Sequence, residues 1–210
     1  MAIPSYLTVT PTSGSGNGSV SISSKVKHTG RVARSSTLKG SMTNYPAVEE
    51  VTINVTESPK TEFVSFSSAT YSATKTGSTL SVTGTSNSSK LTFSYPSNGI
   101  GIAAITSYKA GSVTATSGTA ISGDPGAAAQ YTFTLSLTYS TNTTVKVRST
   151  QIKVTANSSS VTATTTITQA AGDPYLWLGS SGTSTFSVTV PQAGTAQSVQ
   201  VLSNDAWEFE

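Results

Sequence analysis

Apolar and polar residues alternate along much of this chain, and helical periodicity is almost absent. A period of two is typical of a half-buried β-strand. The clearest example is residues 130–139, whose apolar positions share one face: Tyr131, Phe133, Leu135, Leu137 and Tyr139. The pattern predicts further strands at residues 19–22, 51–56, 80–83, 91–95, 145–147, 151–155, 160–168, 185–190 and 198–202.

Turn signals separate these predicted strands. Glycine, proline, asparagine and serine gather at residues 13–18, 96–99 and 123–126, and such clusters mark turns. Many short strands joined in this way, without helices, point to β-sandwiches. The chain therefore belongs to the all-β class, and its 210 residues allow one to three domains.

Two segments of the chain repeat each other's order of residues. Residues 34–39 read Arg-Ser-Ser-Thr-Leu-Lys, and residues 148–153 read Arg-Ser-Thr-Gln-Ile-Lys. A strand follows each of them and ends at Glu57 or Gln169, which lie 23 and 21 residues after the arginine. The beginning of the chain thus resembles the second half of its middle part.

A second repeat links the middle of the chain to its end. The distance from Gly77 to Asn87 is ten residues, as is that from Gly194 to Asn204, and a Ser-Val pair lies between in both copies. Two large apolar residues follow each asparagine, and they are Leu91 and Phe93 in one copy and Trp207 and Phe209 in the other.

These repeats predict a half module at residues 1–57, a complete module at 61–171 and a second half module at 174–210. A lone half would expose an apolar sheet face and unpaired strand edges, which proteins avoid. We therefore expect the two halves to complete each other. Closure within one chain gives a circularly permuted module, and closure between chains gives head-to-tail strand exchange and a homo-oligomer. In a third alternative, each end is a minimal sheet packed on its neighbour.

Several stretches carry a more specific pattern. Residues 201–207 fit V-x-S-N-x-x-W, residues 6–18 resemble W-L-x-V-x-P-x-S-G-x-G-x-G, His28-Thr29-Gly30 with Arg34 resembles N-T-G-x-x-R, and residues 166–169 fit T-x-T-Q. Together they resemble the BACON family, immunoglobulin-like modules of gut Bacteroidetes and of the phages that infect them. The expected fold is therefore all-β, with tandem immunoglobulin-like (BACON-type) β-sandwiches, one of them split between the N- and C-terminal segments.

The chain departs from the family pattern at several positions. Tyr6 replaces a tryptophan, Glu57 replaces the closing glutamine, and the middle module has Leu91 where the family has tryptophan. In the family the tryptophan strand precedes the Pro-Ser-Gly loop, whereas here it comes last, as a split module predicts. The resemblance implies a carbohydrate- or mucin-binding module, a spacer, or a capsid, fibre or tail protein of a phage.

Charge adds one candidate contact surface. Charged residues make up 10% of the chain and the net charge is +3, a bias too small to indicate nucleic acid. Discounting Arg34 as a repeat residue, the acid-free stretch around it leaves Lys25, Lys27, Arg31 and Lys39. They either lie on a solvated hairpin or bind an acidic capsid surface.

Chemistry of other kinds finds little support in the residues. The chain has no cysteine and one histidine, His28, which we expect to be a surface loop residue rather than part of a metal site or a Ser–His pair. Glu49 and Glu50 would point to opposite faces of a strand, which is wrong for glycoside hydrolysis. We therefore expect no enzyme, no cofactor and no metal.

The two tryptophans remain as candidates for binding. Trp207 follows the Ser-Asn strand end, and we expect it to fill the core. Trp177, in Tyr175-Leu176-Trp177-Leu178, is placed equally well in a core or in a contact with a partner or glycan.

The function expected from the sequence is that of a virion structural protein. It would be a capsid auxiliary (decoration) protein, with the major capsid protein or a head fibre as partner. The alternative is a glycan- or mucin-binding adhesion module. No secretory signal or apolar run long enough to span a bilayer is visible, so we expect assembly in the host cytoplasm, location on the capsid exterior, and no membrane contact.

Overall fold

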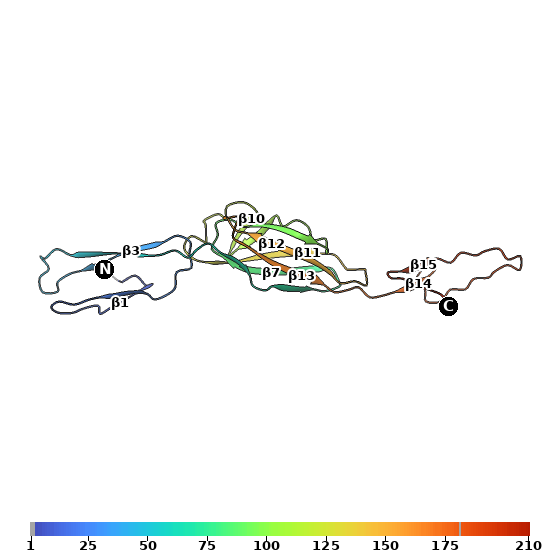
Figure 1. Ribbon diagram of the computed structural model, residues 1–210, viewed down its shortest axis with the longest axis horizontal. Coiled ribbons are helices and arrows are strands. Elements are labelled where there is room, and N and C mark those ends of the chain that lie inside the picture. Colours follow the sequence, from blue (N-terminus) through green and yellow to red (C-terminus); the bar gives the residue numbers. More distant parts are fainter. Residues whose placement is uncertain (1–2, 181) are drawn as a thin grey trace.

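The computed structural model describes residues 3–180 and 182–210, and within them the chain forms strands and no helix. Figure 1 shows an elongated molecule with three parts in a row. The N-terminal segment (described over residues 3–57) lies at one end, the central module (residues 61–171) in the middle, and the C-terminal segment (described over residues 174–180 and 182–210) at the other end. Across the described ranges, no helix has the length and apolarity to cross a membrane.

The central module consists of two sheets. The first has five strands in the order β10-β9-β11-β7-β5, all antiparallel to their neighbours. Its strands are β5 (Val64–Phe66), β7 (Ser78–Ser86), β9 (Ser107–Ala110), β10 (Val113–Thr116) and β11 (Tyr131–Tyr139). The alternating residues of β11 explain this position, because a central strand of a sheet that covers a core needs one apolar face.

The second sheet has four strands in the order β6-β13-β12-β8. Strand β6 runs parallel to β13, and the other pairs are antiparallel. The strands are β6 (Thr70–Ala73), β8 (Thr92–Asn98), β12 (Arg148–Thr155) and β13 (Thr162–Gln169).

One hydrophobic core lies between these two sheets. Phe133 and Leu135 of the first sheet and Ile152 and Ile167 of the second are all fully buried. The ring of Phe133 meets that of Phe93 from the opposite sheet at a centroid distance of 5.7 Å. Since the whole core cluster falls within residues 64–167, the central module is a β-sandwich with a core of its own.

The terminal segments are built from hairpins. The N-terminal segment pairs β1 (Leu7–Thr10) with β2 (Ser21–Ser24) and β3 (Arg34–Gly40) with β4 (Val51–Glu57). The C-terminal segment pairs β14 (Leu176–Leu178) with β15 (Val201–Ser203).

The pairing in both terminal segments repeats that of the central module. Arg34 lies opposite Glu57 in β3–β4, just as Arg148 lies opposite Gln169 in β12–β13. In the C-terminal segment, the β14–β15 pairs Leu176–Ser203 and Leu178–Val201 reproduce the β5–β7 pairs Val64–Ser86 and Phe66–Gly84.

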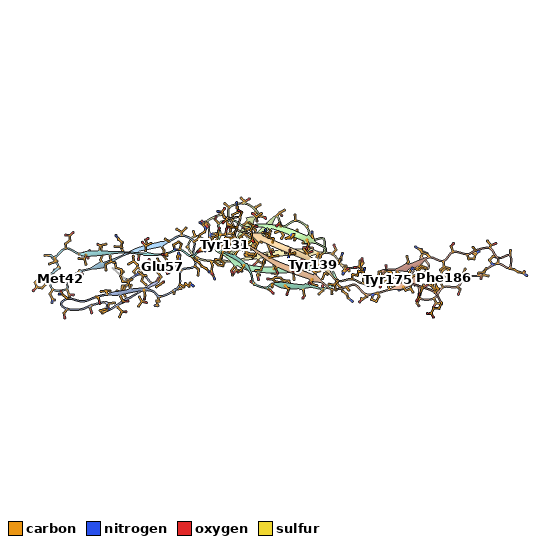
Figure 2. The ribbon with its side chains drawn as sticks, viewed as in Figure 1. Met42, Glu57, Tyr131, Tyr139, Tyr175 and Phe186 are labelled. Carbon is orange, nitrogen blue, oxygen red and sulfur yellow. The ribbon has the colours of Figure 1, made fainter. Side chains whose placement is uncertain are left out.

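The two terminal segments do not meet within the chain. In the parts of the chain that the structure describes, no strand of one segment pairs with a strand of the other. Figure 2 shows Met42 and Phe186 on opposite sides of the central module, where Tyr131 and Tyr139 mark the ends of β11. Closure of a split module within one chain is therefore not present in this structure.

Two predicted strands are wrong. Residues 145–147 form no strand and lie in a bend and loop before β12, and residues 185–190 form no strand. The second case has a physical reason, because a strand needs a neighbour for its backbone groups. In the central module the strand between β5 and β7 is β6, whose neighbour is β13. The equivalent of β13 in the terminal segments is β4, which lies at the far end of the molecule.

Candidate interaction surfaces

Exposed apolar side chains gather at the two ends of the molecule. Among the described residues, nine large exposed hydrophobics lie in the N-terminal segment and eight in the C-terminal segment. The central module, although it is larger than either, has only Val147. Exposed apolar side chains in such numbers are typical of segments that bind another molecule.

In the N-terminal segment, side chains that should face a core have no cover. The shared register makes Ile53 the counterpart of Thr165 and Leu38 the counterpart of Ile152. Ile53 is 45% exposed, whereas Thr165 is 1% exposed. Leu38 is half-buried, whereas Ile152 is fully buried. The segment thus has the inner face of a sandwich without the opposing strands.

A hollow of about 570 Å³ opens between the two N-terminal hairpins. Its lining includes Gly40 at the end of β3 together with Met42, Val48 and Val51. By the same register Gly40 corresponds to Val154, which lies opposite Phe93 in the central module. The hollow therefore lies where an aromatic side chain would be expected.

The C-terminal segment has aromatic side chains without a core to enter. Trp207 is 50% exposed and Phe209 is 66% exposed, and their rings touch at a centroid distance of 5.1 Å. Their counterparts Leu91 and Phe93 are 0% and 8% exposed. The prediction that Trp207 fills the core is wrong for the single chain, because the sheet that would cover it is not beside it.

Trp177 lies on the other face of the same hairpin. It is 46% exposed and stacks on Tyr175 at a centroid distance of 4.7 Å, while Gly182 covers part of its ring. Its counterpart in β5 is Ser65, which is exposed. Trp177 therefore points outward rather than into a core, and it stays a candidate contact.

The structure divides the basic stretch that the sequence singled out. Arg31 is paired with Asp124 of the central module, and Lys39 is paired with Glu50 at 2.8 Å. The hydrogen bond from Lys39 lowers the pKa of the Glu50 carboxyl. Within the described ranges Lys25 and Lys27 form no ion pair. The four residues are thus not one free basic surface.

Arg34 has a structural role in its hairpin. Its Nε donates to Glu57 Oε2 at 2.5 Å, and its guanidinium lies 3.9 Å from the centre of the Tyr6 ring. Ser24 also donates to Glu57, at 2.6 Å. Glu57, which stands where the central module has Gln169, therefore has its carboxylate paired with Arg34 across β3 and β4.

His28 is buried, so the prediction of a surface loop residue is wrong. Its exposure is 6%, and its Nε2 lies 2.7 Å from the carbonyl oxygen of Val32. A carbonyl only accepts, so Nε2 carries the proton. Asn142 makes the equivalent hydrogen bond in the central module, where its Nδ2 donates to the carbonyl of Lys146, four residues further along the chain. His28 thus anchors a loop.

Asn87 builds the joint between the N-terminal segment and the central module. It is fully buried, its Oδ1 accepts from the Phe63 amide at 2.9 Å, and its Nδ2 lies 3.2 Å from the Thr29 carbonyl oxygen. The linker contributes a second bond, from the Lys60 amide to the Gly30 carbonyl at 2.8 Å.

Asn204 builds the next joint in the same way. Its Oδ1 accepts from the Tyr175 amide at 3.0 Å, and its Nδ2 lies 2.9 Å from the Thr143 carbonyl oxygen. The Gly172 amide donates to the Thr144 carbonyl at 2.7 Å. Sequence reasoning found the Ser-Asn repeat but missed this role, because the carbonyl partners carry no side-chain signal.

In the described part of the chain, no three histidine, cysteine, aspartate or glutamate side chains come together as a metal site would require. Comparison of the sequence with protein-family models and with curated proteins finds no match.

Proposed function

We propose that this chain is a non-enzymatic virion structural protein of a phage, built from immunoglobulin-like modules. It acts as an auxiliary (decoration) protein on the outside of the capsid, where it binds the major capsid protein or links a head fibre. Its placement on a virion is supported by the resemblance of its sequence motifs to modules of phage structural proteins.

The observation that carries the structural role is the repeated joint. Asn87 and Asn204 join consecutive parts of the chain through hydrogen bonds to equivalent backbone groups. The result is a long array with exposed apolar side chains at both ends. Such an array suits a protein that spans distance and joins other molecules.

The test is the composition of the particle. Virions of the phage that encodes the chain are purified, and the chain and the major capsid protein are quantified by mass spectrometry. A decoration protein is expected at a fixed ratio to the shell protein in every preparation, and accessible to antibody on intact particles. Its absence from washed particles would refute the virion role.

A second candidate function is glycan binding, and one observation favours it. Tyr175 and Trp177 form an exposed aromatic pair with ring planes 32° apart. Aromatic faces of this kind can stack on sugar rings, and the pair points away from the uncovered inner face of its hairpin.

A glycan array separates the two candidates. Binding by the wild-type chain that is lost in Trp177→Ala and kept in Tyr45→Ala, a control with another exposed aromatic residue, would favour the adhesion role. No binding by the wild type at any array position would leave the decoration role as the proposal.

A further inference from the structure

Each end of the molecule has free strand edges, and the two sets correspond. In the central module β11 pairs with β7, β12 with β8, and β13 with β6. The N-terminal segment has strands equivalent to the first member of each pair, namely β2, β3 and β4, and among the described residues each has a free edge. β2 corresponds to β11 because Arg34 donates to the Val26 carbonyl just after β2, as Arg148 donates to the Thr141 carbonyl just after β11.

The C-terminal segment has the equivalents of the second members. β15 corresponds to β7 through its pairing with β14, and Trp207 and Phe209 stand where β8 begins. Residues 185–190 lie between β14 and β15, as β6 lies between β5 and β7, and they pair with no strand among residues 3–180 and 182–210. The C-terminal segment thus contains counterparts of β6, β7 and the start of β8, which are the neighbours that β4, β2 and β3 lack.

Charge follows the same division. The N-terminal segment contains five basic and three acidic side chains, and the C-terminal segment contains three acidic and no basic ones. The two ends therefore attract each other, whereas two C-terminal segments repel.

We propose that the chain assembles head to tail, with the C-terminal segment of one copy completing the N-terminal segment of the next copy as a single β-sandwich. Trp207 and Phe209 of the first copy enter the hollow beside Gly40 of the second. The two segments lie at opposite ends of the molecule (Figure 1), so the contact repeats and produces a fibre unless its curvature closes a ring. This assembly is independent of the virion role, because it requires only this chain.

The central module gives the register of the composite sandwich. Val154 lies opposite Phe93 and Lys153 opposite Ser94 in the β12–β8 pair. The equivalent positions place Phe209 opposite Gly40 and Glu210 opposite Lys39 of the next copy. Lys39, which is paired with Glu50 in the single chain, would then have a second carboxylate beside it.

A complementation experiment tests the direction of assembly. Trp207→Asp with Phe209→Asp blocks the C-terminal segment, and Val51→Asp with Ile53→Asp blocks the N-terminal segment. All four side chains are exposed in the single chain, so folding is preserved. Val147→Asp, at the exposed apolar residue of the central module, is the matched control.

Mass is measured by light scattering after size-exclusion chromatography across a range of concentrations. The wild type and the control form species larger than a monomer, and either blocked variant alone weakens association by about 30-fold or more, as loss of a central aromatic contact does. An equimolar mixture of the two blocked variants forms dimers and nothing larger. A monomeric wild type, or either blocked variant associating alone as strongly as the wild type, overturns the proposal.

A crosslink tests the register. Facing residues of neighbouring strands have Cα atoms about 4.5–5.5 Å apart, within the range that a disulfide spans, and the chain has no cysteine of its own. Lys39→Cys mixed with Glu210→Cys should form a disulfide-linked dimer on mild oxidation. Lys39→Cys mixed with Gln197→Cys is the control. Equal crosslinking of both mixtures would contradict the stated register.

Discussion

At the scale of single residues, one tight contact lies within the first sheet of the central module, where Gly84 of β7 sits between β5 and β11. A Cβ on Gly84 would collide with the ring of Phe133 and with the backbone carbonyl of Ser65. The ring is fully buried and the carbonyl belongs to the neighbouring strand, so neither group can move aside without a cost in free energy.

Gly84→Ala is therefore expected to lower the free energy of unfolding by about 1–3 kcal/mol, the usual result of adding a methyl group to a filled core. Chemical denaturation measures it. Gly14→Ala, at a glycine with open space around it, should change stability little, and equal effects of the two substitutions would contradict this account.

Buried and half-buried tyrosines make the central module sensitive to alkali. Burial raises the pKa of Tyr95 to about 12 and also raises the pKa of Tyr108 and Tyr131. In the unfolded chain these phenols release their protons near the ordinary tyrosine pKa of about 10, whereas in the folded chain they retain them to higher pH. The stability they contribute is present below about pH 10 and is lost as pH rises toward the folded pKa.

Tyrosinate absorbance and far-UV circular dichroism are expected to change together above about pH 10. Tyr95→Phe removes one of the groups and should move this transition to higher pH. A transition unchanged by Tyr95→Phe would show that the ionisation of this phenol is not coupled to folding.

Single residues also show where sequence reasoning stops. The basic stretch was visible as composition, but the partner of Arg31 is Asp124, 93 residues away, and no local pattern announces such a pair. His28 was expected at the surface because its neighbours are glycine and lysine. Instead its ring is buried in a loop of the N-terminal segment, where it makes the same hydrogen bond as the Asn142 side-chain amide makes in the central module.

At the scale of elements, the β3–β4 hairpin should respond to acid. The hydrogen bond from Arg34 and a second from Ser24 lower the pKa of Glu57. The stability this adds is present above the ordinary pKa of the carboxyl, about 4.5, and is lost as pH falls below that value. Amide exchange of β3 and β4 should therefore accelerate in acid. In Glu57→Gln the acceleration should be absent, and its persistence would exclude this ion pair as the cause.

The joint at Asn87 should matter more for the central module than the joint at Asn204. Asn87→Ala removes a buried amide with several backbone partners, so a loss of about 1–3 kcal/mol is expected. Asn204→Ala alters only the attachment of the C-terminal segment. Thermal unfolding of both variants makes the comparison, and equal shifts would contradict the separation of the two joints.

Elements with internal partners were predictable from the sequence, and elements without them were not. Residues 130–139 alternate strictly, and β11 forms there. Residues 185–190 alternate equally well, yet they form no strand in the single chain. Alternation predicts that a segment can join a sheet. It does not predict which strand will lie beside it, because that neighbour can be far away in the chain or belong to another chain.

At the scale of the whole molecule, the central module should be able to stand alone. All of its core lies within residues 64–167, and its two sheets cover each other. A fragment spanning residues 61–171 is expected to unfold cooperatively in denaturant and to remain monomeric, since it lacks both uncovered faces. An unfolded or aggregating fragment would show that the terminal segments are part of the same folding unit.

The identity of the two joints has a consequence for any fibre of this protein. Asn87 and Asn204 repeat one set of backbone bonds, so each module would be turned and advanced from the last by the same screw operation. Every chain would add two such steps, one for its own sandwich and one for the shared sandwich. Electron micrographs would then show a strong axial period of one module and a weaker period at twice that length, which marks the true subunit.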